Sequence, residues 1–325
     1  MVVWIGVDFM SFSSSVKDEL SKVKIENNST MIAELSGYLR MCGTIRILNF
    51  SELGLFFSTE NASVARRILT FIKKLYTSEV ELAVRKNRQL KRKNSYLIRL
   101  GDTASVRVLL DETSFIRSEN VFSPNYQMDP SLIRDTESLS GYIRACFLGS
   151  GSITNPEKAY HLEFVTNNKE HGHDLVYWLS KVGFEAKCIE RKDVFVVYLK
   201  EAEMISDLLA FMGGSQSVLQ FESTRVIKDV RNNVNRLVNC ETANLSKTIN
   251  ASMKQIEDIK YIDRVIGLAK LDNSLRQIAN YRLENPEASL QEIGQSLQPN
   301  ISKSGVNRRL KKIHDIADQL KGDVK

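Results

Sequence analysis

Cysteine, histidine and proline are scarce in this sequence, which contains four, four and five of them among its 325 residues. The cysteines are scattered and form no C-x-x-C pair, so zinc-site spacing and a disulfide framework are both missing, and a reduced compartment is expected. His171 and His173 could together bind a metal, but no third ligand lies near them, and a loop or helix start accounts for them better. We therefore expect neither a metal site nor a cofactor.

Long apolar runs are missing as well. No run reaches the ~18 residues that a membrane-spanning helix needs, so we expect no membrane partner. Residues 1–9 are apolar, but they have neither a basic n-region nor a cleavage site, which argues against a secretory signal. A serine-capped amphipathic pattern follows Met10, and we expect Met10 to be the natural start, with residues 1–9 as an extension. These features together predict a cytoplasmic protein.

The composition is otherwise that of a folded protein with several domains. Hydrophobic residues make up 42% of the chain, and its net charge is +6. This basic balance permits nucleic-acid binding without proving it. At this length two or three domains are expected, and no motif implies a small-molecule substrate.

The stretch 289–313 predicts two short helices joined by a turn. Ser289 and Glu292 have the spacing of a capping box, which places a helix start there. Pro299 and Asn300 then break this helix. In the second helix, apolar residues repeat at steps of four and three and form one stripe; they are Val306, Leu310, Ile313, Ala317 and Leu320. This layout is typical of a helix-turn-helix that reads double-stranded DNA.

The other face of the second helix is polar and basic. Ser302 or Ser304 can cap the helix, and their hydroxyls suit phosphate oxygens. Asn307 and Arg308 are of the types that reach base edges. A solvated helix face is the alternative explanation for such a run of charge. The predicted DNA-binding residues are Ser302, Lys303, Ser304, Asn307, Arg308, Arg309, Lys311 and Lys312.

Residues 10–217 contain an internal duplication with a period of roughly a hundred residues. The order helix, two strands, helix, two strands, helix occurs over about 10–118 and again over about 131–217. Two glycine-ended helices, 35–43 and 143–151, open corresponding strands, and we align the copies on Gly43 and Gly151. Aligning instead on the string Leu-Ser-Gly-Tyr at 35 and 139 would shift the copies by one helical turn. The fold class is therefore α+β.

Residues 218–255 predict a helical connector that is rich in asparagine and poor in acids. It is either solvated or contacts DNA phosphates. Two further helices, 256–268 and 274–283, begin an all-α domain over 256–325. A basic segment, 85–93, serves either DNA or a protein surface. The secondary DNA-contact candidates are Arg231, Arg236, Lys247, Lys91 and Arg92.

The repeated helix resembles the LAGLIDADG helix of homing endonucleases. That resemblance implies two such helices packed together, a four-stranded sheet in each half forming a saddle on DNA, and an acidic residue before each terminal glycine that holds catalytic magnesium. Cys42 and Ser150 stand at these two positions, and Arg40 and Leu148 stand at the motif's other acidic position. None of the four replaces a carboxylate as a ligand for a hard metal ion. The resemblance therefore predicts the fold and argues against DNA cleavage.

Nearly the whole chain after Met10 resembles the WhiA family of regulators in Gram-positive bacteria. The matching stretches are 10–20, 143–153, 234–245 and 301–310. The resemblance implies a DNA-binding, nucleoid-associated regulator of sporulation or cell-division genes that has no enzymatic activity, with RNA polymerase or other regulators as candidate partners. A nucleoid-associated architectural or scaffold protein is the alternative.

Overall fold

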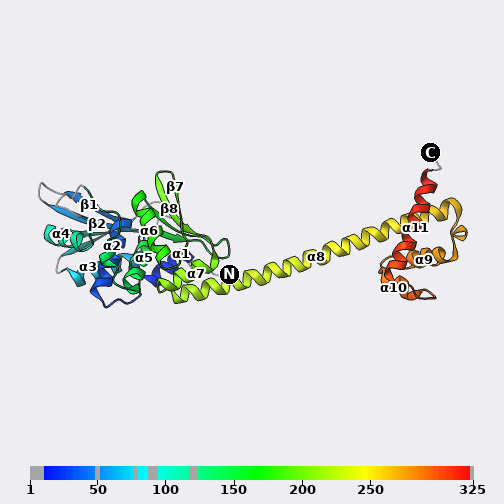
Figure 1. Ribbon diagram of the computed structural model, residues 1–325, viewed down its shortest axis with the longest axis horizontal. Coiled ribbons are helices and arrows are strands. Elements are labelled where there is room, and N and C mark those ends of the chain that lie inside the picture. Colours follow the sequence, from blue (N-terminus) through cyan, green and yellow to red (C-terminus); the bar gives the residue numbers. More distant parts are fainter. Residues whose placement is uncertain (1–10, 48–51, 77–78, 87–93, 117–122, 323–325) are drawn as a thin grey trace, which may run out of the picture. The chain divides into compact units, whose positions relative to one another are not determined.

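The computed structural model describes residues 11–47, 52–76, 79–86, 94–116 and 123–322. The chain divides into two compact units, an amino-terminal unit, Met1–Lys228, and a carboxyl-terminal unit, Asp229–Lys325. Figure 1 shows the helices and strands of both units. Among the described residues, no helix is both long and apolar enough to cross a membrane.

The amino-terminal unit confirms the predicted duplication. After α1 (Phe12–Leu20), the first copy consists of α2 (Asn28–Cys42), β1 (Gly43–Ile47), β2 (Leu53–Thr59), α3 (Ala62–Leu75), β3 (Val80–Arg85), β4 (Ser95–Leu100) and α4 (Thr103–Glu112). The 3-10 turn η1 (Pro130–Leu132) precedes the second copy, which consists of α5 (Thr136–Ser150), β5 (Gly151–Ile153), β6 (Leu162–Thr166), α6 (Lys169–Lys181), β7 (Lys187–Arg191), β8 (Val194–Leu199) and α7 (Ala202–Phe211). Each copy forms an antiparallel four-stranded sheet with the same strand order, β1-β2-β4-β3 and β5-β6-β8-β7.

Helices α2 and α5 pack against each other at the centre of the unit. A Cβ atom placed on Gly37 would lie 2.8 Å from the carbonyl oxygen of Tyr142, and one placed on Gly149 would lie 2.8 Å from the Cβ of Met41. Glycine at these two positions therefore permits a backbone approach that any side chain would block. The two helices end immediately before Gly43 and Gly151, where strands β1 and β5 begin. The alignment on these two glycines is confirmed.

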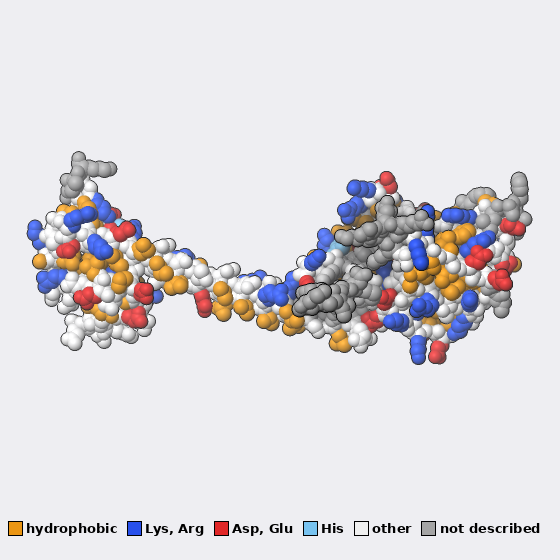
Figure 2. Space-filling model, turned by 180° about the vertical axis from the view of Figure 1, so that it is seen from behind, with side chains coloured by type: hydrophobic (Ala, Val, Ile, Leu, Met, Phe, Trp, Pro, Cys, Tyr) orange, Lys and Arg blue, Asp and Glu red, His pale blue; other side chains and the backbone are white. Residues whose placement is uncertain are grey.

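Helix α8 (Ser215–Ile266) is continuous over 52 residues, so the prediction of a separate helix over 256–268 is wrong. The reason is local, because no glycine or proline lies between Ser215 and Ile266 to interrupt the helix. It ends at Gly267, whose φ of 79° is accessible mainly to glycine. Apolar side chains remain exposed along α8 (Figure 2), and Leu237 and Leu245 are each 61% exposed.

The carboxyl-terminal unit packs its helices on the end of α8. It continues through η2 (Leu268–Lys270), α9 (Asn273–Glu284), α10 (Leu290–Ser296) and α11 (Lys303–Gly322). Its core is a single apolar cluster that includes Ile259, Ile262, Leu275, Ile278, Ile293, Val306, Leu310 and Ile313. This core fixes how α11 presents its outer face.

Candidate nucleic-acid interface

The predicted capping box starts α10. The backbone amide of Glu292 donates to the Ser289 hydroxyl at 3.3 Å, and the Ser289 amide donates to the Glu292 carboxylate at 2.7 Å. Both donors belong to a helix end whose amides otherwise lack partners. Both hydrogen bonds of the capping box that the spacing of Ser289 and Glu292 predicts are therefore present.

The turn between α10 and α11 is tight. The Ile301 amide donates to the carbonyl oxygen of Gly294 at 3.0 Å. A Cβ atom on Gly294 would lie only 2.2 Å from the carbonyl oxygen of Ile301, so this position accepts no side chain without a backbone shift. Ser302 precedes α11 and its hydroxyl accepts from the Gly305 amide at 3.3 Å, whereas Ser304 lies within the first turn. Of the two predicted capping serines, Ser302 is the cap.

The two faces of α11 differ as the sequence predicts. Val306, Leu310, Ile313 and Ala317 are at most 4% exposed and face the core. The outward set consists of Ser302, Lys303, Ser304, Asn307, Arg308, Lys311 and Lys312, which are exposed, and Arg309, which is half-buried. Residues 303–313 contain five basic side chains and no acidic one.

None of these five cations forms a hydrogen bond or ion pair with another residue in the part of the chain that the structure describes. Ser302, Lys303, Ser304 and Asn307 line a shallow groove of about 520 Å³ together with Leu290 at the start of α10. The amino-terminal ends of α10 and α11 therefore lie on the same surface. Such a surface offers hydroxyls, backbone amides and cations to a polyanion.

An ion-paired cluster that the sequence analysis missed holds α11 on α8. The buried carboxylate of Asp258 is 2.6 Å from Nδ1 of His314 and 2.8 Å from Nζ of Lys321. His314 also lies 3.3 Å from Asp318 through Nε2. Asp258 is 56 residues from His314 in the sequence, so no local pattern predicts their contact. The cluster ties α11 to α8.

Of the five secondary DNA-contact candidates, three lie on α8 and two lie outside the described residues. Arg231, Arg236 and Lys247 are exposed on α8 and lie in the carboxyl-terminal unit. Lys91 and Arg92 lie outside the described residues. The structure therefore leaves the three α8 side chains accessible, with their cationic heads in solvent.

The two positions that hold magnesium in the endonuclease motif carry unsuitable ligands here. Burial raises the pKa of the Cys42 thiol to about 12, which keeps it neutral. The Ser150 hydroxyl donates to the carbonyl oxygen of Val165. Arg40 is buried and donates to backbone carbonyls, including that of Gln127 at 2.9 Å, and Leu148 is fully buried. A neutral thiol, a hydroxyl, a cation and an alkyl group do not form a site for Mg²⁺.

The two histidines lie in the first turns of α6, which begins at Lys169; His171 is buried and His173 is exposed. Both ring nitrogens of His171 are already bonded, Nε2 to the Tyr142 hydroxyl at 3.1 Å and Nδ1 to the Thr166 hydroxyl at 3.3 Å. Burial, together with the nearby charge of Arg40, lowers the pKa of His171 to about 3. His171 is therefore a neutral core residue.

A duplicated α/β unit built on two glycine-ended helices, followed by a helix-turn-helix domain, defines the class of this protein. Three family models match in the same order: the WhiA N-terminal LAGLIDADG-like domain over residues 28–116, the WhiA LAGLIDADG-like domain over 139–231, and the WhiA C-terminal HTH domain over 234–317. The chain belongs to the WhiA family.

Individual relatives match over nearly the full length. The "Probable cell division protein WhiA" of Clostridium botulinum (strain Hall) is 45% identical over 316 residues, which are 97% of this chain and 100% of the relative. The protein of the same name from Thermoanaerobacter pseudethanolicus is 46% identical over 313 residues, 96% of this chain and 98% of the relative. The crystal structure of full-length WhiA from Thermotoga maritima is 28% identical, with a TM-score of 0.58, and the match covers 95% of this chain and 99% of that one.

Proposed function

We propose that this chain binds double-stranded DNA through α10 and α11 and regulates transcription of cell-division or sporulation genes. The supporting observation is the outer face of α11. It begins with a polar helix start, and it carries five cationic side chains that have no partner among the described residues. The helix-turn-helix family match and the names of the curated relatives agree with this proposal. The bacterial nucleoid, in the cytoplasm, is the corresponding location.

The mechanism follows from the order of residues along α11. The helix enters the major groove with its amino terminus leading, and the hydroxyls of Ser302 and Ser304, with Lys303, contact backbone phosphates. Asn307 and Arg308 reach base edges, where each well-placed contact discriminates by ~1–3 kcal/mol. Arg309, Lys311 and Lys312 hold flanking phosphates and make the affinity depend on salt.

Charge reversal on this face should abolish specific binding. We expect the double substitution Arg308→Glu, Arg309→Glu to weaken binding to a target duplex by at least about a hundredfold at matched salt, because contacts are lost and repulsion replaces them. Fluorescence anisotropy with a genomic target duplex measures this. The control, Lys260→Glu with Lys270→Glu, makes the same change in net charge at exposed positions of the same unit. Equal affinity of the α11 variant and the parent would refute the assignment.

We also propose that the protein does not cleave DNA, because the motif positions lack carboxylates. Supercoiled plasmid incubated with the protein and Mg²⁺ should remain intact on an agarose gel. Nicking that rises with protein concentration and stops on chelation of the metal would contradict this. An active homing endonuclease gives that second result.

The exposed cations of α8, Arg231, Arg236 and Lys247, favour additional contacts that do not depend on sequence. Such contacts suit the second candidate function, an architectural protein of the nucleoid. Chromatin immunoprecipitation with sequencing separates the two: a regulator gives sharp promoter peaks, and an architectural protein gives broad coverage. RNA polymerase and other regulators remain candidate partners within the first proposal.

A further inference from the structure

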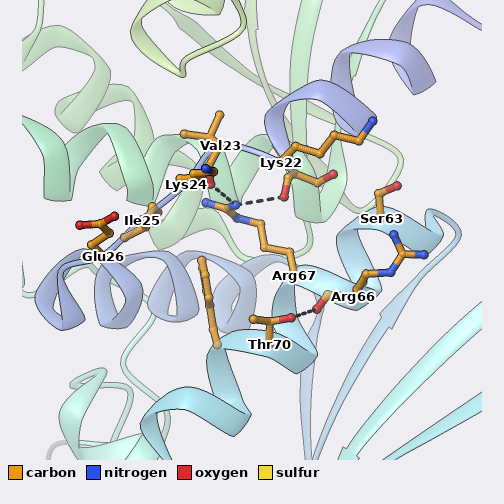
Figure 3. A pocket seen from close by; sticks show the side chains of 11 residues that line it. Lys22, Val23, Lys24, Ile25, Glu26, Ser63, Arg66, Arg67 and Thr70 are labelled. Atoms are coloured by element: carbon orange, nitrogen blue, oxygen red, sulfur yellow. Dashed lines mark hydrogen bonds between the residues drawn. The ribbon is translucent and has the colours of Figure 1, made fainter.

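The amino-terminal unit contains a pocket with a cationic rim. Its volume is about 360 Å³, and it lies between α3 and residues 21–26, which join α1 to α2 (Figure 3). Lys22, Lys24 and Arg66 stand at the rim, and their charged side-chain groups form no hydrogen bond or ion pair with another described residue. Glu26 is the one acid of the lining, whereas the charge of Arg67 is offset by a buried ion pair. The accessible lining therefore has two excess positive charges.

The remainder of the lining combines three hydroxyl residues, Ser21, Ser63 and Thr70, with apolar surface, and the hydroxyls of Ser21 and Thr70 already donate to backbone carbonyls. Ser63 lies beside Arg66 in Figure 3, on the same side of the pocket. Val23, Ile25 and Phe71 supply the apolar wall. Pockets that bind small molecules are mostly apolar with a few placed polar groups, and they measure ~300–1,000 Å³. A phosphate monoester carries about −1.5 to −2 charges at neutral pH, which matches the charge of this lining.

We propose that this pocket binds a small organic molecule that carries a phosphate monoester. Lys22 and Arg66 approach the pocket from opposite walls, the inter-helix segment and α3, and hold the phosphate between them. The organic part lies against Ile25 and Phe71. Ionised hydrogen-bond partners of this kind are about twice as strong as neutral ones, so the phosphate provides the main attraction.

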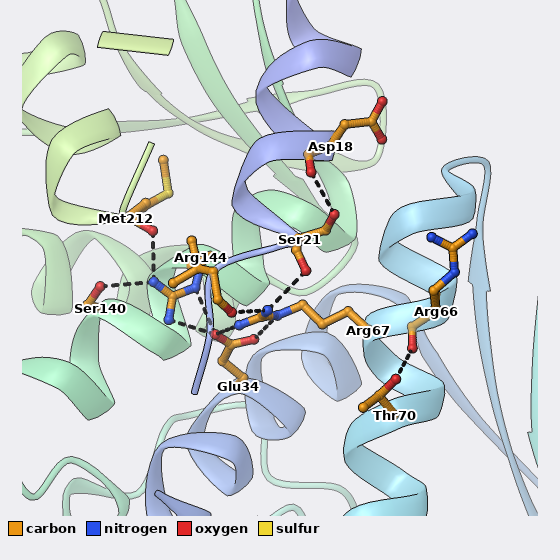
Figure 4. Close-up of polar contacts among 10 residues, drawn as sticks. Asp18, Ser21, Glu34, Arg66, Arg67, Thr70, Ser140, Arg144 and Met212 are labelled. Atoms are coloured by element: carbon orange, nitrogen blue, oxygen red, sulfur yellow. Dashed lines mark hydrogen bonds and ion pairs between the residues drawn. The ribbon is translucent and has the colours of Figure 1, made fainter. Parts of the chain in front are cut away.

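A buried ion cluster keeps the wall of this pocket in place (Figure 4). Arg67 donates from Nε and Nη2 to the two carboxylate oxygens of Glu34, both at 2.8 Å, and from Nη1 to the Ser21 carbonyl at 3.0 Å. The same carboxylate lies 2.7 Å from Nη2 of Arg144. Arg67 therefore holds the start of segment 21–26 in place, and its charge is already paired with Glu34. The side chains of Lys22, Lys24 and Arg66, whose charged groups have no partner among the described residues, can bind a ligand.

The pocket wall also touches the root of α8, where that helix leaves the amino-terminal unit. A Cβ atom on Gly213, in the turn before α8, would lie 3.1 Å from a methyl group of Val23. Glu19, at the end of α1, accepts from the amides of Gln216 at 2.7 Å and Ser217 at 2.8 Å and so caps α8. A bound ligand would stiffen the segment that lies between the pocket and this root. The ligand would then act as an effector, a role that rests on the proposed DNA-binding function, whereas the binding itself does not.

The test uses phenyl phosphate as probe, titrated into the full-length protein by isothermal calorimetry. We expect saturable binding, with weaker binding of inorganic phosphate and none of benzyl alcohol, because the pocket recognises both parts of the probe. The substitution Lys22→Gln with Arg66→Gln should weaken phenyl phosphate binding by at least about tenfold. The control, Lys73→Gln with Lys74→Gln, removes the same charge from exposed positions of α3 outside the pocket and should bind like the parent.

Three outcomes would overturn the proposal. The first is that phenyl phosphate shows no binding at concentrations up to about 10 mM, because a Kd above this value is too weak for a specific ligand. The second is equal loss in the pocket and control variants, which indicates general charge attraction. The third is loss of duplex DNA affinity in the pocket variant without any phenyl phosphate binding, which assigns the rim to the DNA backbone. The Arg308→Glu, Arg309→Glu variant should still bind phenyl phosphate, so failure of the proposed function is distinguishable.

Discussion

Replacing Glu34 with alanine is expected to lower the free energy of unfolding of the amino-terminal unit by about 3–5 kcal/mol. Glu34 is fully buried and is the shared anion of Arg67 and Arg144, which are themselves 6% and 3% exposed. Without the carboxylate, two guanidinium groups remain buried side by side with no counter-charge. Their remaining partners are backbone carbonyls and the Ser140 hydroxyl, which carry no net charge to offset the repulsion.

Urea denaturation followed by tryptophan fluorescence measures this effect. Trp178 lies in α6 of the amino-terminal unit, and residues 229–325 contain no tryptophan, so its emission reports on the amino-terminal unit. The control is Glu81→Ala, which breaks the pair between Glu81 and Arg99, whose side chains are 71% and 39% exposed. Exposed pairs contribute at most about 1 kcal/mol. An equally small effect of both substitutions would show that the buried cluster relaxes into solvent when its anion is lost.

This ion cluster lies beyond what sequence reasoning could find. Glu34 and Arg144 interrupt two apolar helical stretches, which marks them as unusual, but their common partner Arg67 lies on another helix. Only the packing of α2, α3 and α5 brings the three together. The cationic pocket was missed for the same reason, since Lys22 and Arg66 line it from two segments that are distant in the sequence.

Features with a local physical cause were predicted correctly. The glycine-ended helices, the capping box at Ser289 and the buried stripe of α11 each depend on residues within one or two helical turns. The break predicted near residue 256 failed because it followed a change in composition at Glu257, whereas ending a helix requires a residue such as Gly267. The DNA-binding role of the α11 residues stays a prediction, because exposure shows availability and not contact.

Replacing Gly294 with valine is expected to disrupt the helix-turn-helix and to abolish DNA binding. The added Cβ would stand 2.2 Å from the carbonyl oxygen of Ile301, and the next atoms, the carbonyl carbon of Ile301 and a methyl group of Val306, would each be 3.3 Å away. A backbone oxygen cannot rotate away as a side chain can, so the turn must open or α11 must leave the core. Overpacking of this kind costs about 3 kcal/mol or more, which is a large part of the stability of a small domain.

The matched control is Gly305→Ala, on the neighbouring helix and inside the first turn of α11. A Cβ atom there meets nothing closer than 3.5 Å, so alanine fits and should stabilise the helix by roughly 0.5–1 kcal/mol. Far-UV circular dichroism follows the helices of both units, so a loss of signal with unchanged tryptophan emission from the amino-terminal unit would place the disruption in the carboxyl-terminal unit. If Gly294→Val melted like Gly305→Ala and still bound its duplex, the close approach of Gly294 to Ile301 would not be required for the reading head to form. The opposite result makes Gly294 the residue that fixes the spacing between α10 and α11, and with it the position of every proposed DNA contact.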